Sequence, residues 1–230
     1  MNAFQLKLIA VVSMLIDHVG LTFHSPERDL LLLRHVGRMA FPLFAFLVIE
    51  SCVHTRDMKK YMGRLLVFGF LSQLPFTLLL QVPLWGIGNI FFTLFGGVLF
   101  IYLYKLAIQS GELLPLLWFM TLFAFGFVLA DRLNVDYRGM GVTFVVVGYI
   151  ARTYPQKHQR YGVMVAFAVM LAILYPPVTA NNLRVFAWAC GSLIPIGIYD
   201  GSRGYRQSWR KWLFYGFYPL HLWVLVLLRG

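Results

Sequence analysis

Long apolar stretches separated by short polar segments dominate the chain. No charged residue occurs from Leu65 to Tyr104, and this interval is too long for one buried helix of a soluble domain. A helix that crosses the hydrocarbon core of a bilayer needs about 20 predominantly apolar residues. We therefore expect an all-α, polytopic membrane bundle of about nine transmembrane helices that forms one domain over residues 1–230. The predicted spans are 6–23, 39–54, 64–81, 90–108, 113–130, 139–152, 161–176, 184–199 and 212–228.

Composition excludes two other classes of protein. Apolar residues make up 60% of the chain and charged residues 13%, whereas soluble domains carry about 25% charged residues. The aromatic content of 17% argues against a disordered chain, because disordered chains are poor in aromatic residues. The net charge is +11, but the basic residues lie mostly between apolar runs. This placement favours contacts with lipid headgroups over binding to nucleic acid.

The basic residues also predict the orientation of the chain. With nine spans, the N-terminus and the even-numbered loops share one side of the membrane. Cytoplasmic loops carry an excess of Lys and Arg, and this side holds most of the 20 such residues. We therefore expect a cytoplasmic N-terminus and an external C-terminus. The residues on the predicted cytoplasmic side are Lys7, Arg56, Lys59, Lys60, Arg64, Lys105, Arg152, Lys157, Arg160, Arg203, Arg206, Arg210 and Lys211.

Ionisable residues also occur inside the predicted membrane spans. Each costs about 2.5–3.5 kcal/mol on insertion unless it faces a polar partner or a water-filled cavity. Asp17 and His18 lie towards the outer half of the first span. Neighbouring residues point about 100° apart on a helix, so we expect each to have its own partner on another helix. His221 lies near the middle of the last span, where an interhelical hydrogen bond and a catalytic role are both open.

Polar side chains near the ends of spans complete the candidate set. Arg34 and Arg38 are four residues apart and would share a helix face, either as headgroup anchors or as binders of an anion. Glu50 and His54 are also four apart, and we expect them to form a local pair. Further candidates in the third span, at its outer turn and in the fifth loop are Gln73, Asn89, Asp131, Asp136 and Tyr137.

These residue types suit group transfer better than redox chemistry or metal-dependent hydrolysis. Imidazole is the usual general base near neutral pH, and guanidinium stabilises a phosphate, a carboxylate or a developing oxyanion. The sequence shows no paired-metal spacing, P-loop, Gly-rich dinucleotide motif or G-x-S-x-G elbow. Cys52 and Cys190 lie far apart in apolar stretches, so we expect two buried thiols and no metal site.

Short motifs along nearly the whole chain resemble, in their order, the signature of TraX-family membrane proteins. One departure is Arg138, which follows Tyr137 at a position where the family often has glycine. The motifs are Met14-Leu15-Ile16-Asp17-His18, Gly37-Arg38-Met39-Ala40-Phe41-Pro42-Leu43-Phe44-Ala45-Phe46, Arg64-Leu65-Leu66, Ser72-Gln73, Gly88-Asn89-Ile90-Phe91-Phe92, Asp136-Tyr137 and Tyr218-Pro219-Leu220-His221.

The resemblance implies an acetyl-CoA-dependent N- or O-acetyltransferase of the bacterial inner membrane. The pattern of a histidine in the first span, an arginine in the next segment and a histidine in a late span is similar to that of the wider superfamily of transmembrane acyltransferases. The acceptor of the acetyl group would be a pilin N-terminus or another envelope component. In this interpretation His18 is the general base or, as a variant, carries the acetyl group transiently. Arg38 stabilises the oxyanion or binds the pantetheine amides, and Asp17, Asn89, Tyr137 and His221 orient these groups. The residues expected to contact the acyl donor or the acceptor are Arg34, Gln73, Asn89, Tyr137, Lys59, Lys60, Arg64 and the cluster Arg206–Lys211.

Two other classes of function remain open from the residues alone. A small proton-coupled transporter or flippase would use Asp17, His18 and Glu50 as a proton relay, and it would not bind acetyl-CoA. A non-catalytic assembly factor would tolerate neutral substitutions at His18. None of these alternatives requires nucleic acid or a metal ion.

Overall fold

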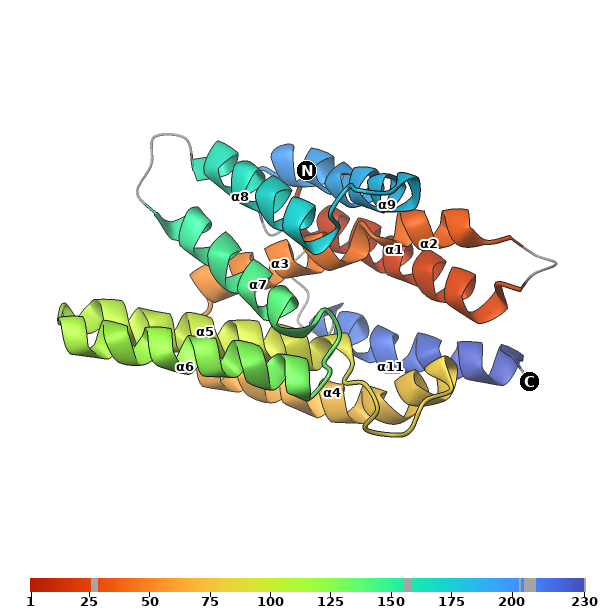
Figure 1. The fold of residues 1–230 in the computed structure, drawn as a ribbon, viewed down its shortest axis with the longest axis horizontal. Helices are drawn as coiled ribbons and strands as arrows, with labels where there is room; N and C mark the ends of the chain where they lie inside the picture. Colours follow the sequence, from red (N-terminus) through yellow and green to blue (C-terminus); the bar gives the residue numbers. More distant parts are fainter. Residues whose placement is uncertain (26–28, 155–158, 203, 205–209, 230) are drawn as a thin grey trace. The chain divides into compact units, whose positions relative to one another are not determined.

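The computed structural model describes residues 1–25, 29–154, 159–202, 204 and 210–229, and the regular elements of this part are α-helices (Figure 1). Only Arg38 and Met39 separate α2 from α3, and only Ser192 separates α9 from α10, so the described helices form nine segments. Each segment lies at one of the nine predicted positions, which confirms the all-α polytopic class. The helices are α1 (Ala3–Phe23), α2 (Leu31–Gly37), α3 (Ala40–His54), α4 (Met58–Leu80), α5 (Ile90–Ser110), α6 (Leu113–Arg132), α7 (Arg138–Thr153), α8 (Gln159–Leu174), α9 (Ala180–Gly191), α10 (Leu193–Gly197) and α11 (Arg210–Arg229).

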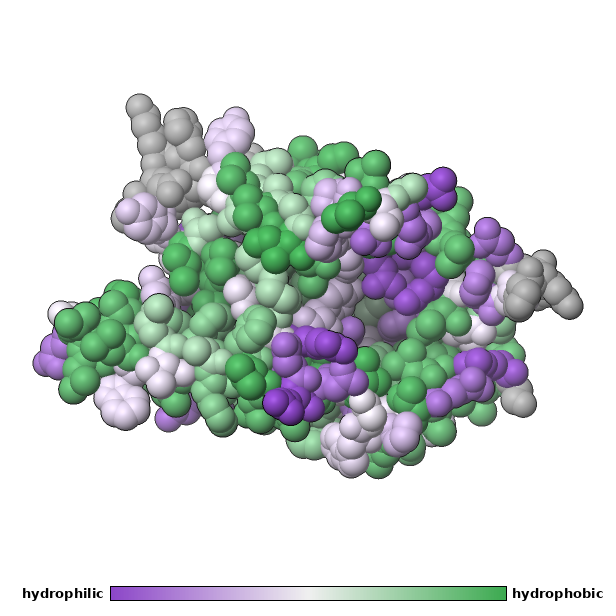
Figure 2. All heavy atoms as spheres, viewed as in Figure 1, coloured by the Kyte–Doolittle hydropathy of each residue, from purple (hydrophilic) through white to green (hydrophobic). Residues whose placement is uncertain are grey.

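Not all of these segments are equally suited to crossing a membrane. Figure 2 shows largely apolar surface over α5 and α6, and Leu113, Trp118 and Phe125 of α6 are each more than half exposed. Such an outward face is what a lipid-facing helix requires. In the described residues six helical segments are long and apolar enough to span, by length and composition: Ala3–Phe23, Leu31–His54, Met58–Leu80, Ile90–Ser110, Leu113–Arg132 and Trp212–Arg229.

The helices form two compact units, the first of which contains Met1–Leu47 and Tyr154–Gly230. In this unit α1 packs against α2 and α11, α2 packs against α9, and α8 packs against α9 and α10. Aromatic rings anchor the first half of α3 in the same unit. The ring of Phe46 lies edge-on to the rings of Phe167 and Tyr199, with centroids 6.2 and 5.4 Å away.

The second unit contains Val48–Thr153, and α5 is its central helix. α5 packs against α4, α6 and α7, and α6 also packs against α7. Rings fill the contact between α5 and α6, where Phe100 lies 5.1 Å from Phe123 and Tyr104 lies 5.6 Å from Phe119 by ring centroid. A helix with three neighbours must be apolar on most of its surface, and this requirement explains the long uncharged run in the sequence.

Some helix boundaries differ from the predicted ones because side chains cap the helices. α4 begins earlier than predicted, since the Asp57 carboxylate accepts a hydrogen bond from the backbone N–H of Lys60 at 2.9 Å. α9 also begins earlier, because the Thr179 hydroxyl accepts from the Asn182 N–H at 3.1 Å. The second predicted span is preceded by α2, and the helix is interrupted at Arg38.

The turn between α6 and α7 and the first residue of α7 include residues in the left-handed region of backbone space. Asn134, Tyr137 and Arg138 have φ values of 49°, 60° and 50°. Asn visits this region routinely, whereas other residues with a Cβ pay roughly 1–2 kcal/mol there. The Gly139 N–H holds the turn by donating to the Asp131 carboxylate at 2.7 Å. The departure from the family motif at Arg138 therefore falls on strained backbone.

We expect Arg138→Gly to raise the free energy of unfolding by about 1 kcal/mol, because glycine adopts a positive φ without the Cβ penalty. Thermal or denaturant unfolding of the purified protein in detergent measures the change. Arg138→Ala is the matched control, since it removes the charge and keeps the Cβ. Equal stability of the two variants would show that the turn is not strained at this residue.

Candidate functional site

The site in the first unit is built on a close approach of α1 and α2 at two glycines. A Cβ atom added to Gly37 would lie 2.2 Å from the Cβ and 2.7 Å from the Cα of Asp17. A Cβ on Gly20 would lie 2.9 Å from the Cβ of Leu33. Small residues let helix backbones approach closely in membrane bundles. The absence of side chains at Gly20 and Gly37 therefore brings Asp17 against α2.

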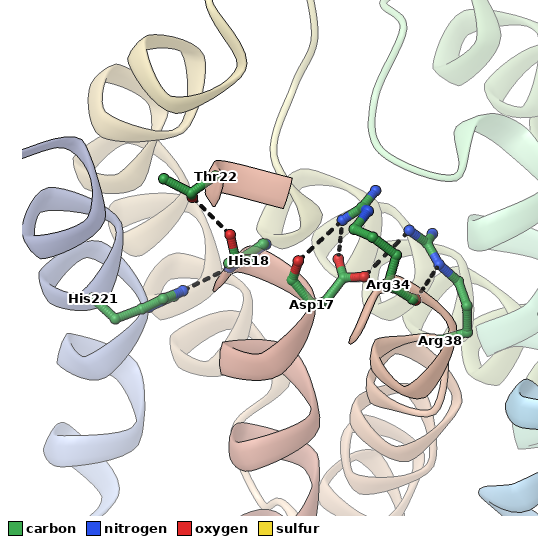
Figure 3. Close-up of polar contacts among 6 residues, drawn as sticks. All are labelled: Asp17, His18, Thr22, Arg34, Arg38 and His221. Atoms are coloured by element: carbon green, nitrogen blue, oxygen red, sulfur yellow. Dashed lines mark hydrogen bonds and ion pairs between the residues drawn. The ribbon is translucent and has the colours of Figure 1, made fainter. Parts of the chain in front are cut away.

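Asp17 forms ion pairs with two arginines of the α2 segment across this contact (Figure 3). Its carboxylate oxygens lie 2.6 Å from Arg34 Nη1 and 3.3 Å from Arg38 Nη2. Arg34 Nη1 also donates to the Asp17 carbonyl at 3.3 Å, and Arg38 Nε donates to the Arg34 carbonyl at 3.3 Å. One carboxylate between two guanidinium groups leaves a formal charge of about +1. The cluster is therefore suited to hold an anion.

His18 forms a separate contact with the last helix. Its Nδ1 lies 2.7 Å from Nε2 of His221, and the two rings are nearly parallel, with an interplanar angle of 10° and centroids 5.0 Å apart. The ring of Tyr218 meets both imidazoles at its edge, with centroids 6.1 and 5.4 Å away. His18 and His221 are both buried. The Thr22 hydroxyl donates to the carbonyl of His18 at 2.7 Å and ties down this turn of α1.

The hydrogen-bond partners assign the tautomers of the neutral pair. His221 Nδ1 lies 2.9 Å from the carbonyl oxygen of Phe217, and a carbonyl can only accept, so Nδ1 carries the proton. His221 Nε2 is then the acceptor, and His18 Nδ1 must donate to it. The lone pair of His18 is thereby placed on Nε2, for which the described residues provide no hydrogen-bond partner. This atom is free to accept a proton from another molecule.

Figure 3 shows that the two contacts point away from α1 in different directions. Asp17 turns towards α2, whereas His18 turns towards His221 of α11. This arrangement confirms the prediction that each residue has its own partner on another helix. The structure directs the Arg38 guanidinium to Asp17 and not to His18. A direct action of Arg38 on a group that reacts at His18 stays a prediction.

The sequence analysis did not predict a polar contact between α2 and α9 in this unit. His35 Nε2 lies 3.1 Å from Asn181 Oδ1, and this pair joins α2 to α9. Figure 2 shows polar side chains gathered near these two helices. The available signal was a third histidine, directly after Arg34, inside the segment that proved to be helical. The partner could not be predicted because it lies far away along the chain.

Gln73 and Asn89 lie in the second unit and bind each other. Gln73 Oε1 accepts from the backbone N–H and the side-chain amide of Asn89 at 3.2 and 2.9 Å. Gln73 Nε2 donates to the carbonyls of Leu84 and Ile87 at 2.7 and 2.8 Å. Both residues are buried, and Asn89 also donates to the Gly69 carbonyl at 2.7 Å. They hold the turn between α4 and α5, and their contact with a substrate stays a prediction.

The predicted donor-binding lysines lie at the start of α4. Lys59 and Lys60 are exposed, and Lys60 Nζ lies 3.3 Å from the Asp57 carboxylate. The backbone N–H of Lys60, together with its ammonium group, lowers the pKa of Asp57, so this carboxylate stays charged and offsets Lys60. Arg64 stacks on a tyrosine ring of α4. The alternative cluster Arg206–Lys211 lies outside the described side chains, and contact of either group with phosphates stays a prediction.

Glu50 and His54 form the expected local pair, with Glu50 Oε2 3.5 Å from His54 Nε2. Glu50 has a second partner that the sequence did not indicate, since Arg152 Nε of α7 donates to its other carboxylate oxygen at 2.5 Å. Glu50 is buried. Tyr137, the remaining predicted contact residue, is half-buried in the turn between α6 and α7. A role for Tyr137 in binding also stays a prediction.

The fold and its internal polar clusters define a multi-pass α-helical membrane protein with ionisable side chains held inside the bundle. A family model described as TraX protein matches residues 3–229. The chain belongs to the TraX family, as its motifs predicted.

Two similar proteins extend this comparison. The chain is 32% identical to the "Probable fimbrial assembly protein FimC, serogroup H1" of Dichelobacter nodosus, over 97% of this chain and 94% of that protein. It is 27% identical to "Uncharacterized protein RP591" of Rickettsia prowazekii (strain Madrid E), over 64% of this chain and 54% of that protein. No solved structure matches the chain.

Proposed function

We propose that this TraX-family protein is an acetyltransferase of the bacterial inner membrane that acts in the assembly of fimbriae or pili. It transfers the acetyl group of acetyl-CoA to an amine or a hydroxyl of its acceptor, for which a pilin N-terminus is the first choice. The name of the Dichelobacter relative supports the process. The hydrogen-bonded pair of His18 and His221 is the observation that carries the chemistry.

The orientation of His18 supplies a general base. The acceptor nitrogen or oxygen attacks the carbonyl carbon of the acetyl thioester while His18 Nε2 takes its proton. The bond between carbon and sulfur then breaks, and the proton passes from His18 to the thiolate of coenzyme A. The products are the acetylated acceptor and free coenzyme A, so atoms and charge balance.

His221 acts as a positioning residue in this mechanism. The imidazolium form of His18 keeps its Nδ1–H, so the hydrogen bond to His221 Nε2 persists through the proton transfer. The Phe217 carbonyl holds His221 in the tautomer that accepts this bond. A fixed base is more effective than a mobile one because it need not be reoriented during the reaction. The positive charge of Arg34 and Arg38 around Asp17 would attract an anionic part of the donor or acceptor.

Release of coenzyme A thiol tests the activity without knowledge of the acceptor. The full chain, inserted in liposomes, receives acetyl-CoA, and thiol release with water as the acceptor is followed over time. We expect slow release above that of empty liposomes. Pilin isolated from the host should in addition lose the mass of one acetyl group when the gene is deleted.

Two results would overturn the proposal. Unchanged pilin mass together with no thiol release would exclude acetyl transfer. Proton flux through the liposomes without binding of acetyl-CoA would instead favour the proton-coupled transporter. A change in pilin mass without thiol release in liposomes would still support acetyl transfer, and it would show that the reaction needs its native acceptor.

A further inference from the structure

Lys105 of α5 points into the second unit. Its Nζ donates to the carbonyl of Cys52 at 2.8 Å and lies 5.3 Å from the ring centroid of Tyr149. Cys52 of α3 is fully buried, and Tyr149 of α7 is 6% exposed. A lysine near the end of a span normally extends its ammonium group to the membrane surface. Lys105 instead directs its ammonium group towards α3 and α7.

This ammonium group has no carboxylate partner within ion-pair distance among the residues that the structure describes. The nearest carboxylate along α3 is that of Glu50, two residues before Cys52, and it is already bound by Arg152. Arg152 follows Tyr149 by three residues on α7, which places it about one helical turn from the ring that Lys105 contacts. Two cations against one carboxylate leave a formal charge of about +1, before any charge on His54.

We infer that the ends of α3, α5 and α7 form a phosphate-binding site in which Lys105 is the principal cation and Arg152 the second. An ionisable group inside a span is costly, and its usual justification is a bound ion or substrate. A lysine ammonium binds phosphate as a point charge, and arginine adds directed donors. The predicted orientation places these helix ends on the cytoplasmic side, where acetyl-CoA is present. The inference rests on the proposed function, because the phosphate is assigned to coenzyme A.

A binding measurement tests this site. The full chain in nanodiscs of phosphatidylcholine is titrated with coenzyme A, and the dissociation constant is compared between the wild type and Lys105→Met. We expect affinity to fall about tenfold or more, the value of one charged hydrogen bond to a phosphate. The matched control is Arg56→Met, which removes one exposed positive charge from the α3–α4 loop and should change affinity by less than about threefold, because exposed charges are screened.

The hydrogen bond to Cys52 makes a structural role of Lys105 the competing explanation. Lys105→Gln keeps a donor for that carbonyl and removes the charge, and it should bind coenzyme A as weakly as Lys105→Met. Affinity equal to the wild type in either correctly folded variant would overturn the inference. Loss of affinity only in a variant of Lys59 and Lys60 would also overturn it, since the exposed lysines would then supply the contacts.

Two further arms separate the inference from the proposed function. In one arm, the titration with coenzyme A is repeated in nanodiscs of phosphatidylglycerol in place of phosphatidylcholine. In the other arm, the protein is titrated with pyrophosphate in place of coenzyme A. Lys105-dependent binding of pyrophosphate without binding of coenzyme A would retain the phosphate site and reject acetyl-CoA as the donor. Competition by phosphatidylglycerol alone would assign the site to a lipid headgroup. Binding of coenzyme A that is independent of Lys105 would reject the phosphate site at Lys105 and leave the proposed acetyltransferase function intact.

Discussion

Replacement of His18 by alanine should lower the rate of acetyl transfer by about 10²–10⁴-fold, the usual contribution of a positioned general base. The protein should remain in the membrane, because the apolar pattern of α1 is unchanged. His18 Nε2 is the atom that the pairing with His221 leaves as proton acceptor. Thiol release from acetyl-CoA and the mass of the pilin, each normalised to the amount of inserted protein, measure the effect.

His18→Gln and His221→Ala are the matched variants. Glutamine keeps a hydrogen-bonding group at residue 18 and provides no base, so it should be about as inactive as alanine. His221→Ala should cost less, because that residue holds the tautomer of His18 and does not take the proton of the acceptor. Near-full activity of His18→Gln, or losses that only follow the amount of protein, would assign both histidines to the stability of the bundle.

Replacement of Gly37 by alanine should separate α1 from α2 and disable the arginine cluster. Ordinary contacts begin at about 3.4 Å, whereas the added Cβ would lie 2.2 Å from that of Asp17. The helices must therefore move by about 1 Å, which costs roughly 1–3 kcal/mol as overpacking. The same movement breaks the 2.6 Å contact of Asp17 with Arg34. Displacement by 1 Å can reduce catalysis by about 10²-fold.

Gly216→Ala in α11 is the control for this variant. A Cβ at Gly216 meets no described atom within 4 Å, and alanine is favoured over glycine within a helix by about 0.8–1 kcal/mol. The control should therefore unfold at the same or a higher temperature and keep its activity. Equal melting temperatures and equal rates of thiol release for Gly37→Ala and the wild type would show that the α1–α2 contact is not tight.

Local patterns of the sequence were enough for the class of the protein and the order of its helices. Apolar runs located all nine helical segments, six of which have membrane-spanning length, because helix formation in lipid depends mainly on residues that are close in sequence. The divergence of Asp17 and His18 followed from helix geometry alone. The pair of Glu50 and His54 was predictable for the same reason, since residues four apart share a face.

The identity of distant partners was decided only by the tertiary structure. His221 meets His18 across 203 residues, and Arg152 meets Glu50 across 102. No periodicity encodes such pairs, because they depend on which helices become neighbours. Arg38 was placed with His18 by its type and depth, whereas close packing at Gly37 directs it to Asp17.

The tertiary structure also changed the interpretation of polar residues that the sequence had assigned to another role. Gln73 and Asn89 had the chemistry of substrate contacts, but the fold saturates Gln73 with internal hydrogen bonds. Lys105 counted in the sequence only as an orientation signal, and packing turns its ammonium group inward. The sequence by itself determined which segments are helices and which side chains are costly in lipid. The tertiary structure decided which partner offsets each cost, because burial and pairing depend on contacts between helices that are distant in sequence.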